Sequence, residues 1–282
     1  MKFHAVLVLF LATAFAHTQE VPYFIAYSHH MEEPGALEIE TKTASGAPIG
    51  SNRFFGNSIE FEYGTTAWWT SELYLDFTGT TNDATVLGGY RIENRIRPLL
   101  SEHWINPVLY VEFEDINAAN KSILEVVGHD AATDFTGPVS LARQEKLREA
   151  ELKLILSSDF KGWNFAENLI FEKNLDNSPW EFGYALAASC PLRLRASTHA
   201  CIACAEKFAA GAELYGGLGT RYTPGLHDTS QYFGPVFAWQ LPHDMRLSVE
   251  EAFGLNSQSL DHLLRFGLAY EFGQLARLRG NR

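Results

Sequence analysis

Charged side chains recur at every second position over much of the first half of this 282-residue chain. In the runs 59–63, 72–77 and 91–97, charged residues alternate with apolar or aromatic ones. Side chains two apart on an extended strand share one face, so neighbouring strands would gather these charges into a ladder. The ladder residues are Glu60, Glu62, Glu72, Asp76, Arg91, Glu93, Arg95, Arg97, Glu112, Glu114, Glu149, Glu151 and Lys153. A charge ladder can line a path for polar solutes, or it can neutralise itself within a filled interior.

Two further groups of residues have spacing that could bind a metal. Cys201 and Cys204 have redox or zinc spacing, but a zinc site needs two more ligands and a thioredoxin-like role needs a βαβ context. We therefore predict a small disulfide or a plain turn there. His29 and His30 are adjacent, and adjacent side chains on an extended chain point to opposite sides. The sequence thus predicts no metal and no cofactor.

Hydrolase chemistry has weak support. A serine nucleophile needs a histidine within hydrogen-bond reach, and the chain has neither a His-x-Ser nor a G-x-S-x-G sequence. His227, Asp228 and Ser230 stand close in sequence but fall in a predicted loop, where we expect them to be solvated. The prediction is that the protein is not an enzyme.

Composition narrows the class of protein. The chain carries 34 acidic and 22 basic residues, a net charge of -12, and has no basic stripe to displace counterions from nucleic acid. Its residues are 46% hydrophobic and 13% aromatic, with 22 glycines, a mixture that favours strands and turns. We therefore expect an all-β protein that does not bind nucleic acid.

The N-terminus has the pattern of a secretory signal. Lys2 precedes an apolar run at 5–16, which is too short to span a bilayer, and Ala14 and Ala16 are the small residues that a signal peptidase reads. Cleavage is predicted after Ala16. We expect an exported chain with a signal peptide at 1–16.

The mature chain alternates in strand-length runs. The predicted strands are 36–44, 57–65, 67–80, 84–97, 105–116, 147–159, 162–174, 180–191, 207–219, 231–241, 245–256 and 262–272. Most are longer than soluble strands and long enough to cross a bilayer at a tilt. With about twelve strands, both termini fall on the side of the shorter turns, which predicts a transmembrane antiparallel up-and-down β-barrel.

The even number of strands, which places both termini at one end of the barrel, requires that residues 117–146 form one long loop. Residues 123–130 could form a strand instead, and that alternative breaks the scheme. Residues 140–150 are helix formers behind a serine cap, so we expect at most a short helix before the sixth strand.

Aromatic residues near the strand ends and the last strand carry a resemblance. Trp68, Trp69, Trp104, Trp163, Trp180 and the segment 264–272 resemble those of Gram-negative outer-membrane β-barrels. The segments 61–66, 91–95 and 180–184 are similar to uncharacterised small barrels of a transporter-like kind. The resemblance implies location in the outer membrane, contact with its lipid, and a final-strand signal read by the barrel-assembly machinery. The aromatic residues of that signal are Phe266, Tyr270 and Phe272.

The resulting organisation is a signal peptide at 1–16, a periplasmic segment at 17–35, a barrel at 36–272 and a tail at 273–282. The function expected is a narrow pore or transporter with a Glu/Arg lumen, passing small solutes, with weak selectivity for cations. The inward-facing residues of strands eight to twelve are small, so we expect them to leave space opposite the ladder. The alternatives are a closed structural barrel with a salt-bridged plug, an outer-membrane hydrolase, and a soluble secreted β-protein.

Overall fold

A computed structural model describes residues 21–122, 126–176, 178–195, 197 and 201–274. The predicted signal peptide and residues 275–282 of the predicted tail lie outside the described residues. In the described chain, twelve strands form one closed barrel. The strands are β1 (Ala36–Gly46), β2 (Phe54–Thr66), β3 (Trp69–Thr80), β4 (Thr85–Ile96), β5 (Asn106–Asn117), β6 (Lys146–Phe160), β7 (Trp163–Asn174), β8 (Trp180–Pro191), β9 (Phe208–Thr220), β10 (Gln231–Leu241), β11 (Met245–Gly254) and β12 (His262–Gln274).

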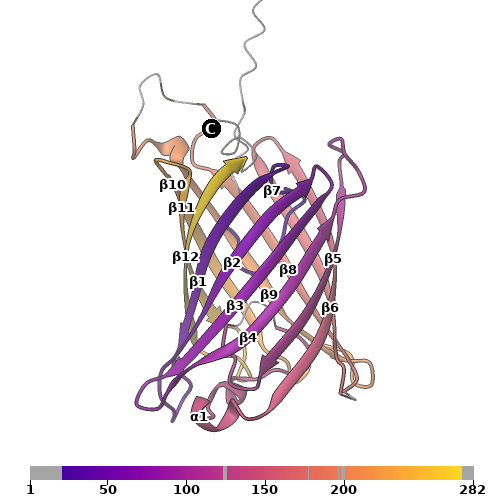
Figure 1. Cartoon of the computed structure of the whole chain (residues 1–282), viewed down its shortest axis with the longest axis vertical. Helices are drawn as coiled ribbons and strands as arrows, with labels where there is room; N and C mark the ends of the chain where they lie inside the picture. The colour runs from indigo at the N-terminus through magenta and orange to yellow at the C-terminus, as the bar shows by residue number, and fades with distance from the viewer. Residues whose placement is uncertain (1–20, 123–125, 177, 196, 198–200, 275–282) are drawn as a thin grey trace, which may run out of the picture.

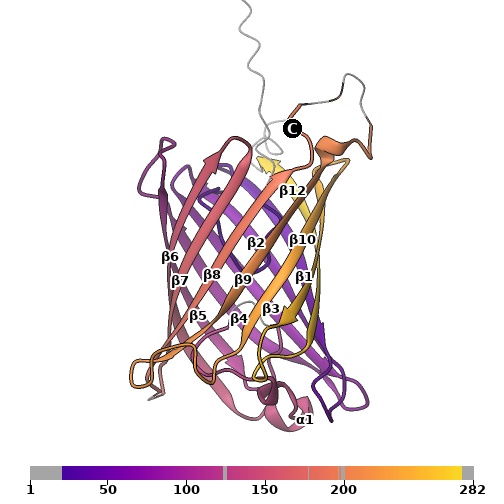
Figure 2. The same cartoon turned by 180° about the vertical axis from the view of Figure 1, so that it is seen from behind.

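The barrel has up-and-down topology. Every strand pairs antiparallel with its neighbours in the sequence, and β12 closes the barrel by pairing with β1 (Figures 1 and 2). The predicted fold class is confirmed. The largest boundary difference is in β2, which begins at Phe54, three residues before its predicted start. One boundary in each of β1, β3, β11 and β12 differs from the prediction by two residues.

The wall of the barrel is apolar outside and polar inside. Leu73, Leu109 and Phe237 are 40–50% exposed on the outer surface, whereas Glu72 and Arg91, on the inner face, are each 2% exposed. Apolar side chains facing outward from a closed sheet are stabilised by lipid and not by water. The outer surface therefore fits a membrane and disfavours the soluble alternative.

The two ends of the barrel differ. β1 begins and β12 ends at the same end, which is uppermost in Figure 1 and is here called the terminal end. The tight turns at 67–68, 161–162 and 242–244 lie there too. The opposite end, here called the loop end, carries the connection from β5 to β6 with the short helix α1 (Val139–Ala142) and the 3₁₀ turn η1 (Ala132–Phe135). Among the described residues, no helix has the length and apolar character needed to cross a membrane.

The alternative strand at 123–130 is absent from the part that the structure describes. Residues 123–125 lie outside that part, and of residues 126–130 only Gly128 makes an isolated bridge, to Gly219. Residues 126–130 belong to the connection between β5 and β6, and the described strands number twelve, so the even strand count predicted from sequence holds.

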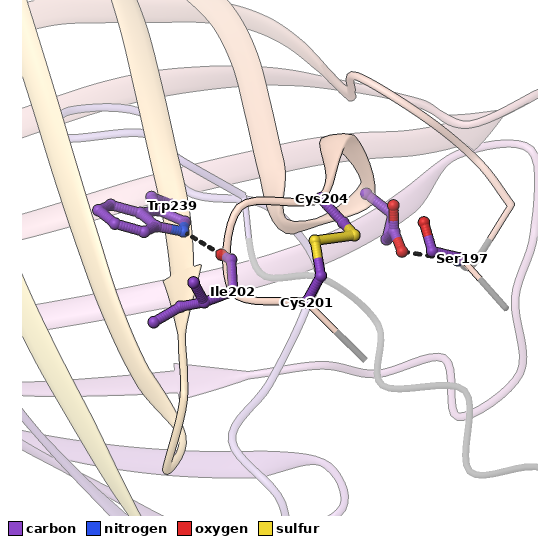
Figure 3. The surroundings of a disulfide bond; sticks show 6 residues. Ser197, Cys201, Ile202, Cys204 and Trp239 are labelled. Atoms are coloured by element: carbon purple, nitrogen blue, oxygen red, sulfur yellow. Dashed lines mark hydrogen bonds between the residues drawn. A yellow bond between two sulfur atoms is a disulfide. The ribbon is translucent and has the colours of Figure 1, made fainter. Parts of the chain in front are cut away.

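A disulfide braces the connection between β8 and β9 at the terminal end (Figure 3). Cys201 and Cys204 are joined by a bond between their sulfur atoms, with 5.5 Å between their Cα atoms. The indole Nε1 of Trp239, on β10, donates a hydrogen bond of 2.9 Å to the carbonyl oxygen of Ile202 within the bridged turn. The 3₁₀ turn η2 (Ala205–Lys207) follows. The bridged turn is thus fixed to the rim of the barrel.

Candidate functional site in the lumen

Nine glutamates form a continuous row across neighbouring strands on the inner wall. The residues placed directly opposite one another in register are Glu271 and Glu38, Glu38 and Glu62, Glu62 and Glu72, Glu72 and Glu93, Glu93 and Glu112, Glu112 and Glu151, Glu151 and Glu172, and Glu172 and Glu181. Side chains placed in this way have Cβ atoms about 4.5–5.5 Å apart. The row, here called the glutamate row, therefore runs unbroken from β12 through β1 to β8.

The glutamate row connects the two ends of the lumen. Glu271 is near the end of β12, at the terminal end, and Glu181 is the second residue of β8, which starts at the loop end. Because barrel strands are tilted to the barrel axis, a row perpendicular to the strands winds along that axis. The carboxylates thus follow a helical path from one end of the barrel to the other.

Basic side chains offset the repulsion along the row. Nε of Arg95 donates to Oε1 of Glu72 at 2.6 Å and lies 3.4 Å from Oε1 of Glu93, and the guanidinium also pairs with Glu62. Like charges directly opposite one another destabilise a sheet, and a shared cation compensates for this. Arg95 therefore holds three members of the row together.

Arg91 and Lys153 form ion pairs with carboxylates in the buried middle of the row. Arg91 donates from Nε to Oδ2 of Asp76 at 2.9 Å and from a terminal nitrogen to Oε1 of Glu112 at 3.0 Å. Nζ of Lys153 lies 2.8 Å from Oε1 of Glu151. All five side chains are at most 2% exposed. Buried ion pairs need good geometry to offset the cost of desolvation, so the positions of these side chains are closely constrained.

The sequence analysis missed a second charged group on the opposite wall. Arg265, on β12, donates to Oε2 of Glu250 at 2.7 Å and to the Tyr215 hydroxyl at 2.8 Å, and Glu213 is 1% exposed. In their strands these four residues occupy the same alternate positions as the small residues predicted to line that wall, so their side chains point into the lumen. Continuing the period of two through β9, β11 and β12 would have found them.

The segment before β1, residues 21–35, lies inside the lumen and is here called the N-terminal segment. The carboxylate of Glu213 accepts hydrogen bonds from the backbone amides of Phe24, Ile25 and Ala26 at 2.7–3.0 Å. Figure 1 shows the indigo chain that precedes β1 passing within the barrel. The sequence analysis places 17–35 in the periplasm; the described part of that stretch occupies the lumen instead, because wall residues satisfy its backbone.

Tyr27 of the N-terminal segment covers the middle of the glutamate row. Its hydroxyl lies 3.2 Å from Oε2 of Glu93 and 3.2 Å from the Tyr74 hydroxyl. Its backbone N–H and C=O both bond to the side chain of Asn168, on β7. The ring packs edge-on against Tyr110, with 5.2 Å between centroids. Tyr27 therefore bridges the lumen from β7 to β3 and β4.

Part of the long loop also enters the lumen, from the loop end. Glycines on the wall make room for it: a Cβ at Gly183 would lie 2.5 Å from the Val126 carbonyl oxygen, and one at Gly56 would lie 2.0 Å from that of Lys121. No side chain fits at such distances, so these glycines allow close approach of the backbone. The described residues of this part, 118–122 and 126–130, are called the lumen loop.

Both inserted segments share one apolar cluster against the small-residue wall. Phe24 and Ile25 of the N-terminal segment and Val126 of the lumen loop belong to the same buried cluster as Ala185 and Ala252 of the wall. The sequence analysis predicts that small residues of strands eight to twelve face the long charged side chains of the ladder across the lumen. In the structure the small-residue wall is covered, because small side chains leave the space that the inserted segments fill.

Among the described residues, two cavities lie along the glutamate row, one at each end. The cavity at the loop end has a volume of about 370 Å³ and the one beside the N-terminal segment about 150 Å³. The first is lined by six carboxylates, Glu114, Asp130, Asp134, Glu149, Glu172 and Glu181, and by a single guanidinium, that of Arg91. Burial, with the nearby Glu181 and Asp134, raises the pKa of Asp130 in the lumen loop to about 7. The second cavity includes Glu271, Glu38 and Glu62.

Most of the predicted ladder residues face the lumen, and Arg97 does not join them. It follows the end of β4, donates from Nε to the Leu99 carbonyl oxygen at 2.8 Å, and bonds Glu102 in the same turn at the terminal end. Because Arg97 lies beyond the end of β4, the alternation of inward and outward side chains along the strand does not apply to it. Phe266, Tyr270 and Phe272, predicted to form the assembly signal, lie on the outer surface with 38–42% exposure; their role stays a prediction.

The hydrolase candidates do not form a catalytic group. The Ser230 hydroxyl donates to the carbonyl oxygens of Asp130 and Gln258 at 2.6 and 3.0 Å, so it is engaged in holding backbone segments. His227 is exposed and pairs with its neighbour Asp228. Neither arrangement activates a nucleophile.

The fold is similar to that of one solved outer-membrane channel. An outer membrane channel from Pseudomonas putida F1 matches with a TM-score of 0.55 at 12% identity, over 90% of this chain and all of that one. Two porins, KdgM and NanC, match with TM-scores of 0.44 and 0.46 at 8% and 10% identity, each over 83% of this chain and over 98% and 97% of their own. No family model and no curated protein sequence matches the chain.

The closed barrel, its apolar exterior and its polar interior define a transmembrane β-barrel of the outer-membrane type. Within that class, this chain is a twelve-stranded, up-and-down barrel whose fold is similar to that of the Pseudomonas putida channel.

Proposed function

We propose that the protein is a narrow outer-membrane channel for small cationic solutes, with the glutamate row as its path and the N-terminal segment as its gate. The observation that carries the proposal is the register: nine carboxylates follow one another from Glu181, at the large cavity, to Glu271, at the small one. A path of closely spaced like charges attracts counterions and repels ions of the same sign.

The composition of the large cavity supports a preference for cations. Six carboxylates against one guanidinium concentrate negative potential at the entrance. The width supports a narrow channel, since eight-stranded barrels are filled by side chains and sixteen-stranded ones enclose water. Tyr27 covers the buried middle of the row, so movement of the N-terminal segment would open that region.

A closed structural barrel is the second candidate. The N-terminal segment and the lumen loop share an apolar cluster inside the lumen, and buried ion pairs such as Arg91–Asp76 cross-link the wall. On this alternative the charges serve only packing and specificity.

Reversal potentials across planar bilayers test the proposal. The purified mature protein is measured in a KCl gradient beside Tyr27→Ala and beside Glu172→Gln/Glu181→Gln. We expect a small cation-selective conductance, increased severalfold in Tyr27→Ala because the cover of the row is removed. The double variant should lose part of the cation selectivity.

The matched controls are Tyr222→Ala and Glu145→Gln, which change exposed residues of the loops. Both should behave as the unmodified protein does. Absence of conductance in the unmodified protein and in Tyr27→Ala would support the closed structural barrel, and anion selectivity would reject the proposed path.

A further inference from the structure

A group of histidine and carboxylate side chains at the terminal end lies apart from the glutamate row. His29 and His30 come from the N-terminal segment, Asp159 from the end of β6, and Glu102 from the turn between β4 and β5. The candidate ligand atoms of His29, His30 and Asp159 all lie within 4.8 Å of one another. The group therefore joins the N-terminal segment to the wall of the barrel.

The two histidines turn toward the same side, which corrects the sequence-based interpretation. Their ring centroids are 4.6 Å apart. The rule that adjacent side chains point apart applies to extended backbone, and His29 lies at a bend. The bend lets two consecutive rings face one carboxylate.

Distances within the group match those between ligands of one metal ion. Nε2 of His30 lies 2.9 Å from Oδ2 of Asp159, and Nε2 of His29 lies 3.8 Å from the same oxygen and 3.0 Å from Oε2 of Glu102. Ligands on a tetrahedral zinc ion with bonds of about 2.0–2.1 Å are roughly 3.3 Å apart. Small side-chain adjustments would place the atoms of His29, His30 and Asp159 around one ion, and a larger rotation of the exposed Glu102 side chain, which contacts only His29 of the three, would supply the fourth.

The state of His29 provides an independent observation. Its side chain is fully buried, and its Nε2 atom, 3.0 Å from Oε2 of Glu102, makes no well-aligned hydrogen bond among the described residues. Nδ1, on the other side of the ring, lies 2.8 Å from the Ser157 hydroxyl, which fixes the ring so that Nε2 faces the carboxylates. Histidine ligands of metals are oriented by such a second contact.

We infer that His29, His30, Asp159 and Glu102 bind one divalent first-row transition metal ion of the zinc type, which fastens the N-terminal segment to the barrel wall. Two imidazoles with carboxylates suit Zn²⁺, Ni²⁺ and Co²⁺ better than the oxygen-preferring Mg²⁺ or Ca²⁺. The ion would cross-link chain positions about 130 residues apart, as the His30–Asp159 contact already does. Binding would therefore stabilise the docked state of the segment by mass action.

Calorimetry with Zn²⁺ on the full mature protein, prepared without a histidine tag and stripped with EDTA, tests this site. We expect one ion per chain with micromolar or tighter affinity, and Co²⁺ should give the visible absorption of a four-coordinate site. His30→Ala and Asp159→Asn should each weaken binding about tenfold or more. These two residues are partly exposed, so their replacement disturbs packing less than that of His29.

His227→Ala, in an exposed loop at the other end, is the matched control and should bind as the unmodified protein does. Hydrogen exchange gives a second readout: Zn²⁺ should slow exchange at residues 21–30 in the unmodified protein but not in Asp159→Asn. No binding, or equal affinity in all variants, would overturn the site. None of these measurements uses conductance, so their outcome is separate from that of the proposed channel.

Discussion

The Glu213 carboxylate accepts a hydrogen bond of 2.8 Å from the backbone amide of Phe24. The same side chain accepts from the amides of the next two residues, so one carboxylate satisfies three consecutive buried N–H groups of the N-terminal segment. A buried donor left without an acceptor costs about 1–3 kcal/mol. Loss of this one side chain of β9 therefore leaves three buried donors of the segment without an acceptor.

Replacing Glu213 should release the N-terminal segment. In Glu213→Ala the three amides lose their acceptor, and we expect faster hydrogen exchange at residues 21–28 and a severalfold higher conductance. Mass spectrometry of exchanged protein and bilayer recordings measure the two effects. Glu145→Ala, at an exposed loop position, is the control. Unchanged exchange in Glu213→Ala would show that the docked state does not need this contact.

Docking should weaken as pH rises. Burial, with the nearby Glu271, raises the pKa of Glu32 in the N-terminal segment to about 8. The other charged groups near it include Arg95, Glu33, Glu72, Glu38 and Glu62. Because the docked pKa exceeds that of a solvated glutamate, about 4.3, docked Glu32 retains a proton that the free segment loses. The stabilisation is complete below about pH 4, falls as pH rises, and is lost above about pH 8.

Hydrogen exchange at residues 21–35, corrected for intrinsic rates, measures this dependence between pH 5 and pH 9. Glu32→Gln cannot ionise and should give a flatter profile. If the unmodified protein and Glu32→Gln have the same profile, Glu32 does not control docking.

Removal of Arg91 should destabilise the whole barrel. Arg91→Met leaves the buried carboxylates of Asp76 and Glu112 without their shared guanidinium, and breaking a buried pair in this way costs about 3–5 kcal/mol. Unfolding by guanidinium chloride in lipid vesicles should show a lower midpoint. Arg143→Met, at an exposed position of the loop, should leave the midpoint unchanged. Equal midpoints for the two variants would contradict the structural role given to Arg91.

A side chain at Gly183 should displace the lumen loop. The Cβ atom of Gly183→Val would meet the Val126 carbonyl oxygen, whereas nothing lies within 4 Å of a Cβ at Gly137. In a Cys190→Ser background, a cysteine at Ser122, which is buried, reports on loop position. A polar maleimide should label it rapidly in Gly183→Val and slowly in Gly137→Val. Slow labelling in both would mean that the loop stays in place.

The strands could be predicted because alternation is a local property. Each strand carries its own inward and outward faces, so the strand count and the parity of the barrel follow from short stretches of sequence. Glu62 and Glu72 come from separate stretches, and only the register places them directly opposite each other. The ladder expected from sequence contains five of the nine row residues, without Glu38, Glu172, Glu181 and Glu271, and the continuity of the glutamate row could not be predicted.

The inserted segments could not be predicted, because their structure depends on distant partners. Residues 21–35 have no regular period, and hydrogen bonds to Glu213 and Asn168 fix their path. The contacts of His29 and His30 were missed for the same reason: a bend, imposed by the surroundings, replaces the extended backbone assumed from sequence.

The N-terminal segment precedes the barrel in the chain, yet several of its hydrogen-bond partners lie 141 to 189 residues later. The chain therefore emerges with the segment first, and the segment has nothing to dock on until β7 and β9 are in place. β1, which follows it directly, pairs with β12, the last strand to be made. Insertion of the segment is thus a late step of assembly, and its protection from exchange would mark molecules whose barrels have finished closing.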